Sequence, residues 1–310
     1  MPVRAIRGLP SVVRHWNPLG NAIHCEAILA AEDARIVASR VRREVQTLLP
    51  KLHWVDDLHF TVGDTNFYVA ELRDARSRKN RLALFKWRWM VEVYDRLIRG
   101  LEPENIVELG IREGGSTAFL AAVALPKKIV AVDLDPTPNR ALASHIETRG
   151  LAEIVKPYYG VDQADRERIE EILQQEYGLD PLDLVVDDAS HLLEQTRCSF
   201  NILFPRLRIG GIYVIEDWPW KHVPGRVVRG DLTIFLFELL MACTFMEGLI
   251  DSIEIDRNMI RLRRGELPVD RDSFDISECY DDHARALLEL LGSGGLATAG
   301  QHYEPGTLEI

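Results

Sequence analysis

Residues 182–220, LDLVVDDASHLLEQTRCSFNILFPRLRIGGIYVIEDWPW, decide the fold of this chain. They contain two apolar, β-branched runs, 182–186 and 212–215, around a segment, 192–207, whose apolar residues recur at helical spacing. Continuous apolar runs of this length are typical of buried parallel strands. The stretch is therefore predicted to form a strand, a crossover helix and a second parallel strand.

Each of the two predicted strands ends in a pair of acids. Asp187 and Asp188 follow the first strand, Glu216 and Asp217 follow the second, and His191 comes shortly after the first pair. In an open parallel sheet, ligands bind beyond the carboxyl ends of the strands. The sequence therefore predicts that the chemistry of the protein takes place at this edge of the sheet.

The same alternation of strand and helix extends in both directions along the chain. Strands are predicted near 105–109, 128–133, 153–157, 183–187 and 211–216, a helix from about 231 to 246, and a final hairpin over 251–264. This order is typical of a doubly wound α/β sheet. We expect a Rossmann-like fold whose mostly parallel sheet is closed by a terminal antiparallel hairpin.

Three parts are predicted along the chain. Residues 101–265 form the catalytic domain. An appendage, 1–100, precedes it, with an arm over the first 20 residues, an amphipathic helix over 25–49, two short strands around the Gly63-Asp64 turn, and a helix over 82–98. Residues 266–310 contain a helix, 281–291, and a glycine-rich tail expected to be poorly ordered.

Composition and charge narrow the class of protein. The 310 residues are 46% apolar, enough for a large core, and the net charge of −11 disfavours a broad nucleic-acid surface. The basic run over 73–99 is interpreted as a solvated helix face. No apolar run has the length of a membrane span, and the four cysteines lie far apart without a CxxC pair. A cytoplasmic protein is expected.

The first predicted strand leads into the glycine-rich turn VELGIREGGST, 107–117. Its glycines, Gly110, Gly114 and Gly115, do not form the G-x-G-x-x-G pattern of dinucleotide sites, because Arg112 stands at the second glycine position. Glu108 would repel a phosphate but attract the amino group of a cationic amino-acid ligand such as S-adenosylmethionine. The alternative is that the glycines only permit tight packing of a helix on the sheet.

Two further acids are candidates for cofactor contacts. Asp133 ends the second strand, where an acid accepts hydrogen bonds from ribose hydroxyls. Asp162 either contacts the adenine edge or caps a helix that begins at Gln163, with Asp165 three residues further on. Both interpretations of Asp162 stay open.

The motifs VELGxxxGGST, VAVDLDP and DDASHLLEQTRCSFNILFPRLRIGGIYVIED, with the terminal hairpin, resemble those of the magnesium-dependent class I methyltransferases that methylate sugar hydroxyls, including macrolide-sugar O-methyltransferases. The resemblance covers about residues 100–265 and implies a seven-stranded sheet. It implies that Asp188, Glu216 and Asp217 bind the metal and that His191 is the general base. The implied cofactor contacts are Glu108, Gly110, Gly114, Ser116, Asp133, Asp162, Gln163 and Asp188.

The residue types agree with this chemistry. Carboxylates without cysteine partners make a hard oxygen site suited to Mg²⁺, for which Mn²⁺ can substitute. Such an ion lowers the pKa of a coordinated sugar hydroxyl, and His191 is placed to take its proton. Each residue also has a simpler interpretation: His191 as a hydrogen-bonding residue at the helix start, Glu216 and Asp217 as a solvated strand end, and Asp187 as a brace of the turn.

The predicted function is S-adenosylmethionine- and Mg²⁺-dependent O-methylation of a sugar hydroxyl in a saccharide or glycosylated metabolite. The alternatives are methylation of another vicinal diol such as a catechol, an NAD-type oxidoreductase, and a non-catalytic cofactor-binding subunit. Trp218 and Trp220 either stack on a sugar ring or pack a loop. We expect a homo-oligomer, with a dimer favoured, that binds neither nucleic acid nor membrane.

Overall fold

A seven-stranded, mostly parallel sheet carries the site in the computed structural model, which describes residues 50–70, 76–78, 80–219 and 232–292. Its strands are β5 (Asn105–Leu109), β6 (Lys128–Asp133), β7 (Val155–Tyr159), β8 (Leu182–Asp187), β9 (Leu207–Glu216), β10 (Ile250–Ile255) and β11 (Met259–Arg264). Their order is β10-β11-β9-β8-β5-β6-β7, and β11 pairs antiparallel with both β9 and β10. The predicted fold class is therefore confirmed.

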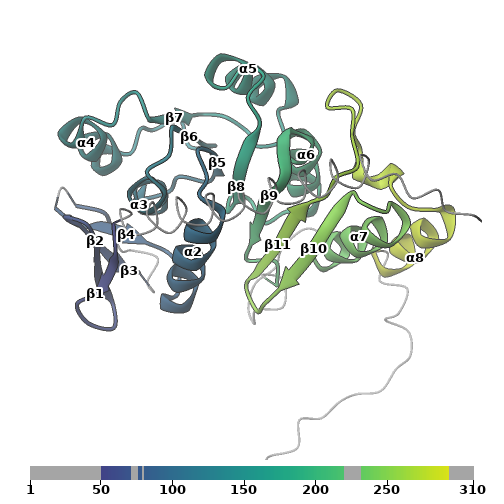
Figure 1. The fold of residues 1–310 in the computed structure, drawn as a ribbon, viewed down its shortest axis with the longest axis horizontal. Helices are drawn as coiled ribbons and strands as arrows, with labels where there is room; N and C mark the ends of the chain where they lie inside the picture. Colours follow the sequence, from purple (N-terminus) through teal and green to yellow (C-terminus); the bar gives the residue numbers. More distant parts are fainter. Residues whose placement is uncertain (1–49, 71–75, 79, 220–231, 293–310) are drawn as a thin grey trace, which may run out of the picture. The chain divides into compact units, whose positions relative to one another are not determined.

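Helices cover both faces of this sheet (Figure 1). They are α2 (Arg88–Leu101), α3 (Gly115–Ala124) and α4 (Arg140–Arg149) on one face and α5 (Arg166–Glu176), α6 (Leu193–Leu203) and α7 (Leu232–Phe245) on the other. Successive side chains of a strand point to opposite faces, so Ile106 packs with the first group and Val107 with the second. Both faces are buried, which explains the continuous apolar runs.

A second sheet of four strands precedes α2. It contains β1 (Leu52–Trp54), β2 (His59–Val62), β3 (Thr65–Val69) and β4 (Leu82–Leu84), with β3 and β4 parallel. The two strands predicted around Gly63-Asp64 are confirmed. The helix predicted from residue 82 is wrong at its start, because 82–84 form β4 and α2 begins at Arg88.

This small sheet shares its core with the catalytic domain. Phe60 and Phe67 stack on each other with ring centroids 5.2 Å apart, and both meet Phe119 of α3 edge-on. The described residues, from Pro50 onward, accordingly group as one compact unit, and the predicted division of the chain at residue 100 stays a prediction.

The chain ends in α8 (Asp282–Gly292), after the short 3-10 helix η3 (Ile276–Glu278), close to the predicted helix over 281–291. The predicted arm, the amphipathic helix over 25–49, Trp220 and the tail after 292 lie outside the described residues. None of the helices in the described part of the chain combines the length and apolar character that a bilayer crossing needs.

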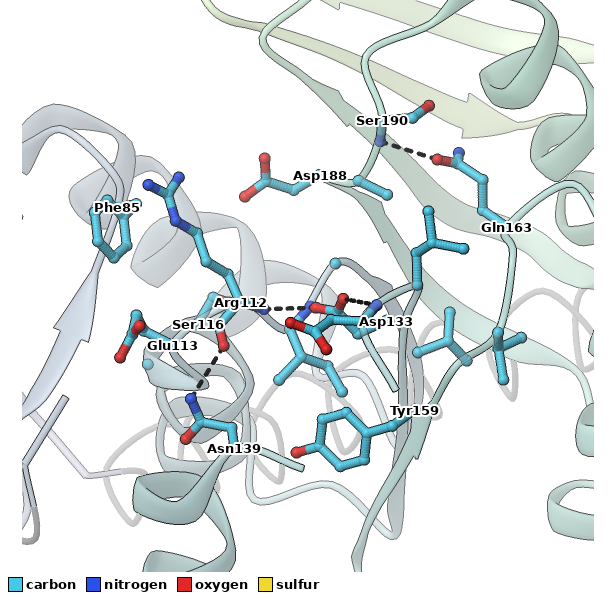
Figure 2. Close-up of a pocket in the computed structure, with 18 of the residues that line it drawn as sticks. Phe85, Arg112, Glu113, Ser116, Asp133, Asn139, Tyr159, Gln163, Asp188 and Ser190 are labelled. Carbon is cyan, nitrogen blue, oxygen red and sulfur yellow. Dashed lines mark hydrogen bonds between the residues drawn. The ribbon is translucent and has the colours of Figure 1, made fainter. Parts of the chain in front are cut away.

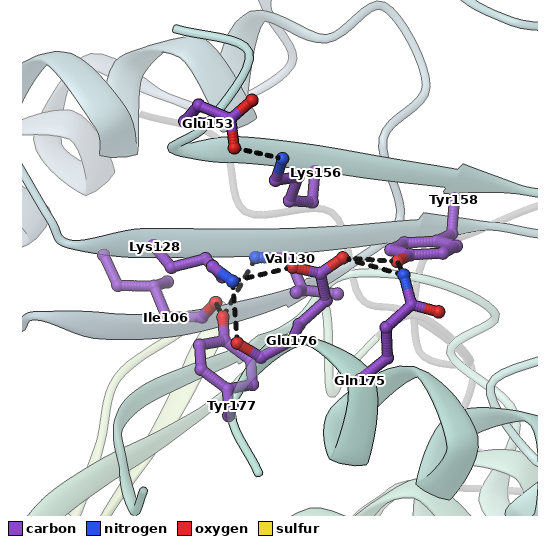
Figure 3. Close-up of polar contacts among 9 residues, drawn as sticks. All are labelled: Ile106, Lys128, Val130, Glu153, Lys156, Tyr158, Gln175, Glu176 and Tyr177. Carbon is purple, nitrogen blue, oxygen red and sulfur yellow. Dashed lines mark hydrogen bonds and ion pairs between the residues drawn. The ribbon is translucent and has the colours of Figure 1, made fainter.

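The amino ends of the parallel strands are held by a polar network (Figure 3). Lys128, the first residue of β6, donates hydrogen bonds to the Glu176 side chain at 2.8 Å and to its carbonyl oxygen at 2.7 Å. Tyr177 accepts the backbone N–H of Val130 at 3.1 Å. This network fixes α5 to the sheet at the end opposite to the predicted site.

Candidate active site

A cavity of about 1090 Å³ lies at the carboxyl ends of the parallel strands (Figure 2). It is lined at one end by Asp133 and Tyr159, the last residues of β6 and β7, with Asp162 just after β7. At the other end it is lined by Asp188, His191 and Asp217, which follow β8 and β9. A cavity of this size accommodates a nucleoside-type ligand together with part of a second molecule. The two halves predicted separately, one for cofactor and one for metal, therefore open into one space.

The glycine-rich turn between β5 and α3 forms one wall of the cavity. Gly110 has φ +96°, and a Cβ atom there would lie 2.2 Å from the carbonyl oxygen of Asp188. A Cβ atom on Gly114, with φ +72°, would lie 2.6 Å from the Leu142 side chain, and one on Gly115 would lie 2.0 Å from the carbonyl oxygen of Ala83. Only glycine fits these positions. The turn thus brings backbone amides and Ser116, at the start of α3, to the cavity.

Asp133 is fixed by the same turn (Figure 2). Its Oδ2 accepts the backbone N–H groups of Ile111 at 2.8 Å and Arg112 at 2.7 Å, and its Oδ1 accepts that of Asp135 at 2.9 Å. A carboxylate has about four acceptor positions. Asp133 thus shapes the turn and keeps acceptor capacity toward the cavity that it lines.

Glu108 lies in β5 and is fully buried, and it is not among the residues that line the cavity. Thr117 donates a hydrogen bond to its Oε2 at 2.5 Å, whereas its Oε1 has no hydrogen-bond partner among the described residues. Burial raises the pKa of Glu108 to about 7. Ser116, next to Thr117, does line the cavity. A buried carboxylate oxygen without a partner is suited to receive a cation.

The structure of the segment after β7 decides between the two expectations for Asp162, helix cap or cavity residue. Helix α5 begins at Arg166, and its N-cap is Asp165, whose Oδ1 accepts the N–H of Arg168 at 3.1 Å. Asp162 instead closes a turn by accepting the N–H of Ala164 at 2.9 Å, and it lines the cavity. The expectation that Asp162 caps a helix is therefore wrong, because the helix starts three residues later than predicted.

Gln163 and Asp187 connect this segment to β8. Gln163 is 6% exposed and accepts the N–H of Ser190 at 2.9 Å (Figure 2). It also donates to Asp187 at 3.2 Å. Ser199 and Tyr213 also donate to Asp187, at 2.6 and 3.2 Å. Burial raises the pKa of Asp187 to about 6. Asp187 thus braces the turn after β8 through these buried hydrogen bonds, as expected. Gln163 fixes the loop that carries Ser190.

Asp188, His191 and Asp217 come together at the other end of the cavity. Each offers one ligand atom, and these atoms all lie within 4.8 Å of one another. The His191 Nε2 atom lies 4.0 Å from Oδ2 of Asp217, whose Oδ1 accepts a hydrogen bond from Asn258 at 2.9 Å. Burial raises the pKa of Asp217. Two carboxylates and an imidazole at these separations are a donor set that fits a divalent cation.

The backbone at this cluster adopts an unusual conformation. Among the described residues, His191 and Asp217 are two of five non-glycine residues in the left-handed region, with φ of +55° and +54°. Arg112, with φ +47°, is a third and also lines the cavity. Such positions persist where the surrounding structure enforces them, and they gather at functional sites.

Glu216 occupies a different position from its sequence neighbour Asp217. Its side chain is 2% exposed and does not line the cavity. Oε1 of Glu216 accepts hydrogen bonds from the ammonium of Lys86 at 2.6 Å and the hydroxyl of Tyr94 at 2.5 Å. Burial raises the pKa of Glu216, while these two donors stabilise its ionised form. The predicted role of Glu216 as a metal ligand stays a prediction.

Lys86 lines the cavity, although the sequence does not point to it. The expectation that the basic run over 73–99 is a solvated helix face is wrong at Lys86, because it lies in the loop between β4 and α2 and is 4% exposed. Its ammonium also reaches Oδ2 of Asp188 at 2.9 Å. Burial lowers the pKa of Lys86, but the two carboxylates outweigh this and raise it. The signal in the sequence was a single lysine within the apolar run LALFKW, 82–87.

The turn between β10 and β11 closes this side of the site. Its Asn258 accepts the N–H of Asp217 at 2.7 Å with its carbonyl oxygen, in addition to the side-chain bond described above. Trp218 donates its indole N–H to the carbonyl oxygen of Asp256 at 2.8 Å. This contact favours the expectation that Trp218 packs a loop over the expectation that it stacks on a sugar.

Comparison with known proteins agrees with this geometry. Residues 107–218 match a family model described as a methyltransferase domain. The chain is 47% identical over 146 residues to the mycinamicin VI 2''-O-methyltransferase of Micromonospora griseorubida, covering 44% of this chain and 33% of that protein. It is 32% identical over 198 residues to the demethylmacrocin O-methyltransferase of Streptomyces fradiae, covering 58% of this chain and 45% of that protein.

Among solved structures, the chain is similar to the MycE methyltransferase from the mycinamycin biosynthetic pathway in complex with Mg, SAH and mycinamycin VI, with 25% identity and a TM-score of 0.48. That similarity covers 59% of this chain and 51% of the other. The chain thus spans less than half the length of the two curated relatives and about half that of this structure.

Proposed function

Because residues 107–218 match the methyltransferase domain family, we propose that this chain transfers the methyl group of S-adenosylmethionine to a hydroxyl group of a sugar, in a saccharide or glycosylated metabolite, with Mg²⁺ at the acidic cluster. The single observation that carries this proposal is the shared cavity, which Asp133 lines at one end and Asp188, His191 and Asp217 line at the other. The relatives named above are O-methyltransferases, and a further similar protein, of Mycobacterium leprae, is named a rhamnosyl O-methyltransferase, which supports a sugar hydroxyl as acceptor.

The cofactor half of the cavity fits a sulfonium amino acid joined to a nucleoside. The glycine turn gives such a ligand access to the backbone and to the amino end of α3. Glu108, buried beside Ser116 and not itself lining the cavity, would supply negative charge toward the ligand's ammonium, and Asp133 would accept ribose hydroxyls. Ser116, Asp162 and Gln163 complete this side of the cavity.

The metal half fits a hard divalent cation held by Asp188, Asp217 and His191. When bound there, Mg²⁺ would lower the pKa of a sugar hydroxyl and orient it. Since Mg²⁺ keeps several positions for water or substrate oxygens, three protein ligands leave room for a diol. These metal ligands and the role of each are part of the proposal.

His191 has two possible duties that the geometry does not separate. It lies close enough to both acids to bind the cation, and it lines the cavity from which a hydroxyl proton must be removed. The resemblance of the sequence implies the second duty, general-base catalysis, and we retain it as the working assignment. In either case, Nε2 lies 4.0 Å from Oδ2 of Asp217.

The experiment that tests the function is transfer of a labelled methyl group from S-adenosylmethionine to a panel of saccharides and glycosides, with and without Mg²⁺. We expect transfer to a sugar hydroxyl that a chelator abolishes and Mg²⁺ or Mn²⁺ restores. Transfer to catechols but not to sugars would exclude the sugar assignment, and transfer that persists in chelator would exclude the metal. A homo-oligomer, with a dimer favoured, and a cytoplasmic location stay predictions, which light scattering and fractionation check.

A further inference from the structure

Arg112 presents a guanidinium group to the cavity without a carboxylate beside it. Its Cζ atom lies 3.6 Å from the centre of the Phe85 ring, and both residues line the cavity (Figure 2). Among the described residues, no acid forms an ion pair with this guanidinium. An arginine whose charge the protein does not neutralise is suited to bind an anionic group of a ligand.

The acids closest to Arg112 have other partners. Glu113, the next residue, accepts the backbone N–H of Ser77 at 2.9 Å and pairs with Arg76 at 3.4 Å. Asp133 binds the backbone of Arg112, whose N–H it accepts at 2.7 Å. The guanidinium therefore keeps its hydrogen-bond donors for the cavity.

The position of the Arg112 side chain is fixed from two sides. Its backbone has φ +47°, its N–H is held by Asp133, and its carbonyl oxygen accepts the side-chain amide of Asn139 at 3.0 Å. Because Cζ lies as close as 3.6 Å to the centre of the Phe85 ring, the guanidinium packs on the ring by its face. The N–H groups at its edge then stay available, in the planar arrangement that matches a carboxylate.

We propose that Arg112, stacked on Phe85, is a carboxylate-binding subsite of the cavity. The amino-acid part of S-adenosylmethionine carries one such carboxylate, and an acidic sugar such as a uronic acid carries another. The inference rests on the proposed function, because it assumes that cofactor and acceptor share this cavity.

The place of Arg112 in the fold favours the carboxylate of the cofactor. Four described cations line the cavity, and two of them are paired, Lys86 with two carboxylates and Arg76 with Glu113. Arg140 begins α4, after β6, on the side proposed for the ribose. Of the four, only Arg112 lies on the glycine-rich turn between β5 and α3.

An amino-acid ligand needs opposite charges close together, because its ammonium and its carboxylate are bonded to the same carbon atom. Glu108, buried at the end of β5, supplies negative charge toward the ammonium. Arg112, three residues after β5, would supply the positive charge for the carboxylate. The two residues would thus recognise the two charges of the amino acid from one turn.

The experiment measures binding of S-adenosylhomocysteine and of its methyl ester to the full chain by calorimetry. The ester keeps the nucleoside and the ammonium but has no carboxylate charge. The variants are Arg112→Met and Arg112→Lys. Arg88→Met is the matched control, because Arg88 also stacks on an aromatic ring, 4.3 Å from the centre of Trp54, but is not among the described residues that line the cavity. Thermal unfolding verifies that each protein is folded.

We expect Arg112→Met to bind S-adenosylhomocysteine at least about tenfold more weakly than the unchanged protein, because a charge-assisted, two-pronged pair is lost. The dissociation constant of the methyl ester should change by less than about twofold, since the ester forms no ion pair with Arg112. Arg112→Lys should recover part of the affinity, because lysine keeps the charge but not the planar fork. Arg88→Met should bind both ligands as the unchanged protein does.

Equal weakening of S-adenosylhomocysteine and its ester in Arg112→Met would overturn the inference, because Arg112 would then only shape the turn. If S-adenosylhomocysteine binds this variant with unchanged affinity, methyl transfer to a glucuronide and to the corresponding glucoside identifies the source of the carboxylate. A KM raised for the glucuronide alone, with kcat unchanged, would assign the subsite to an acidic acceptor. An unchanged ratio of the two KM values would overturn the subsite altogether.

Failure of the proposed function gives a different result. In that case the unchanged protein itself binds no S-adenosylhomocysteine, and the inference falls with the function. Binding to the unchanged protein that Arg112→Met retains for every ligand, with the KM ratio also retained, overturns the inference and leaves the proposed function standing.

Discussion

The backbone of Gly110 lies against the carbonyl group of Asp188, so closely that a Cβ atom on Gly110 would be 2.2 Å from that oxygen. The backbone N–H of Asp188 in turn donates to the carbonyl oxygen of Leu109 at 2.9 Å. The glycine-rich turn after β5 and the loop after β8 that carries Asp188 are thus in direct backbone contact. A substitution in either segment should therefore alter ligand binding at both ends of the cavity.

Gly110→Ala should therefore weaken cofactor and metal binding together. The substitution adds the strain of a positive φ, about 1–2 kcal/mol, to a clash with backbone that cannot move aside as a side chain can. Calorimetry with S-adenosylhomocysteine and with Mn²⁺ measures the two effects.

Gly178→Ala is the control for Gly110→Ala, because Gly178 has φ +58° but no atom within 4 Å of the added Cβ. It should lower stability by a similar strain and leave both affinities unchanged. If Gly110→Ala loses only one of the two ligands, the two halves of the cavity are independent.

Asp133→Ala should weaken S-adenosylhomocysteine binding by about 1–3 kcal/mol, the cost of leaving ribose hydroxyls unpaired. Part of the effect will come from the turn, because Asp133 also holds the N–H groups of Ile111 and Arg112. Asp133→Asn keeps an acceptor oxygen for the turn, so it should recover part of the affinity.

Asp270→Ala is the matched control for Asp133→Ala. Asp270 also accepts a backbone N–H, that of Asp272 at 3.1 Å, but it does not line the cavity. Asp270→Ala should therefore leave the affinity for S-adenosylhomocysteine unchanged. Equal affinity of Asp133→Ala and the unchanged protein, measured by calorimetry, would remove Asp133 from the cofactor site.

The central strands were predictable because their physical signal is local. β5, β6 and β8 are buried on both faces and are mostly apolar, and their bounds agree with the prediction to within a residue. β7 lies at the edge of the sheet and contains Pro157, and its prediction was two residues early. The start of the helix predicted from residue 82 is wrong, because periodicity cannot distinguish so short a strand as 82–84 from a helix.

The site was predictable only in part. The acids at the strand ends were found because topology alone brings the carboxyl ends of parallel strands together. Lys86 was missed because its partners Asp188 and Glu216 are 102 and 130 residues away, and no local pattern contains that information. The difference between Glu216 and Asp217, adjacent in sequence, likewise follows from the position of Lys86 and not from the acids themselves.

Cofactor binding should release a proton near neutral pH. The pKa of Glu108 in the folded protein is about 7, because the carboxyl is buried, so about half of the molecules carry this proton at pH 7. A ligand ammonium bound in the neighbouring cavity favours the ionised form and displaces the proton. Calorimetry in buffers of different ionisation enthalpy should find a fraction of a proton released per ligand at pH 7, and less at pH 8.

Glu108→Gln removes the titrating group and should abolish this proton release while weakening binding. The raised pKa of Glu108 also makes the stability of the folded protein depend on pH. The folded-state pKa lies above the ordinary value of 4.5, so ionisation of Glu108 destabilises the ligand-free protein progressively as the pH rises from about 4.5 to 7. Glu108→Gln should therefore gain stability relative to the unchanged protein at pH 8 but not at pH 4.5. Proton release that persists in the Gln variant would assign it to another group.

His191→Ala should lower kcat by about 10² to 10⁴, the usual range for loss of a general base, with little change in cofactor affinity. His191→Gln decides between base and ligand, because glutamine keeps a hydrogen-bonding oxygen but cannot accept a proton at neutral pH. Since Nε2 also lies among the three candidate ligand atoms, Mn²⁺ affinity must be measured beside kcat. A base predicts loss of kcat with Mn²⁺ affinity retained, whereas a ligand predicts loss of both. Near-native kcat in His191→Gln, with Mn²⁺ still bound, would show that His191 only positions the substrate and that solvent takes the proton.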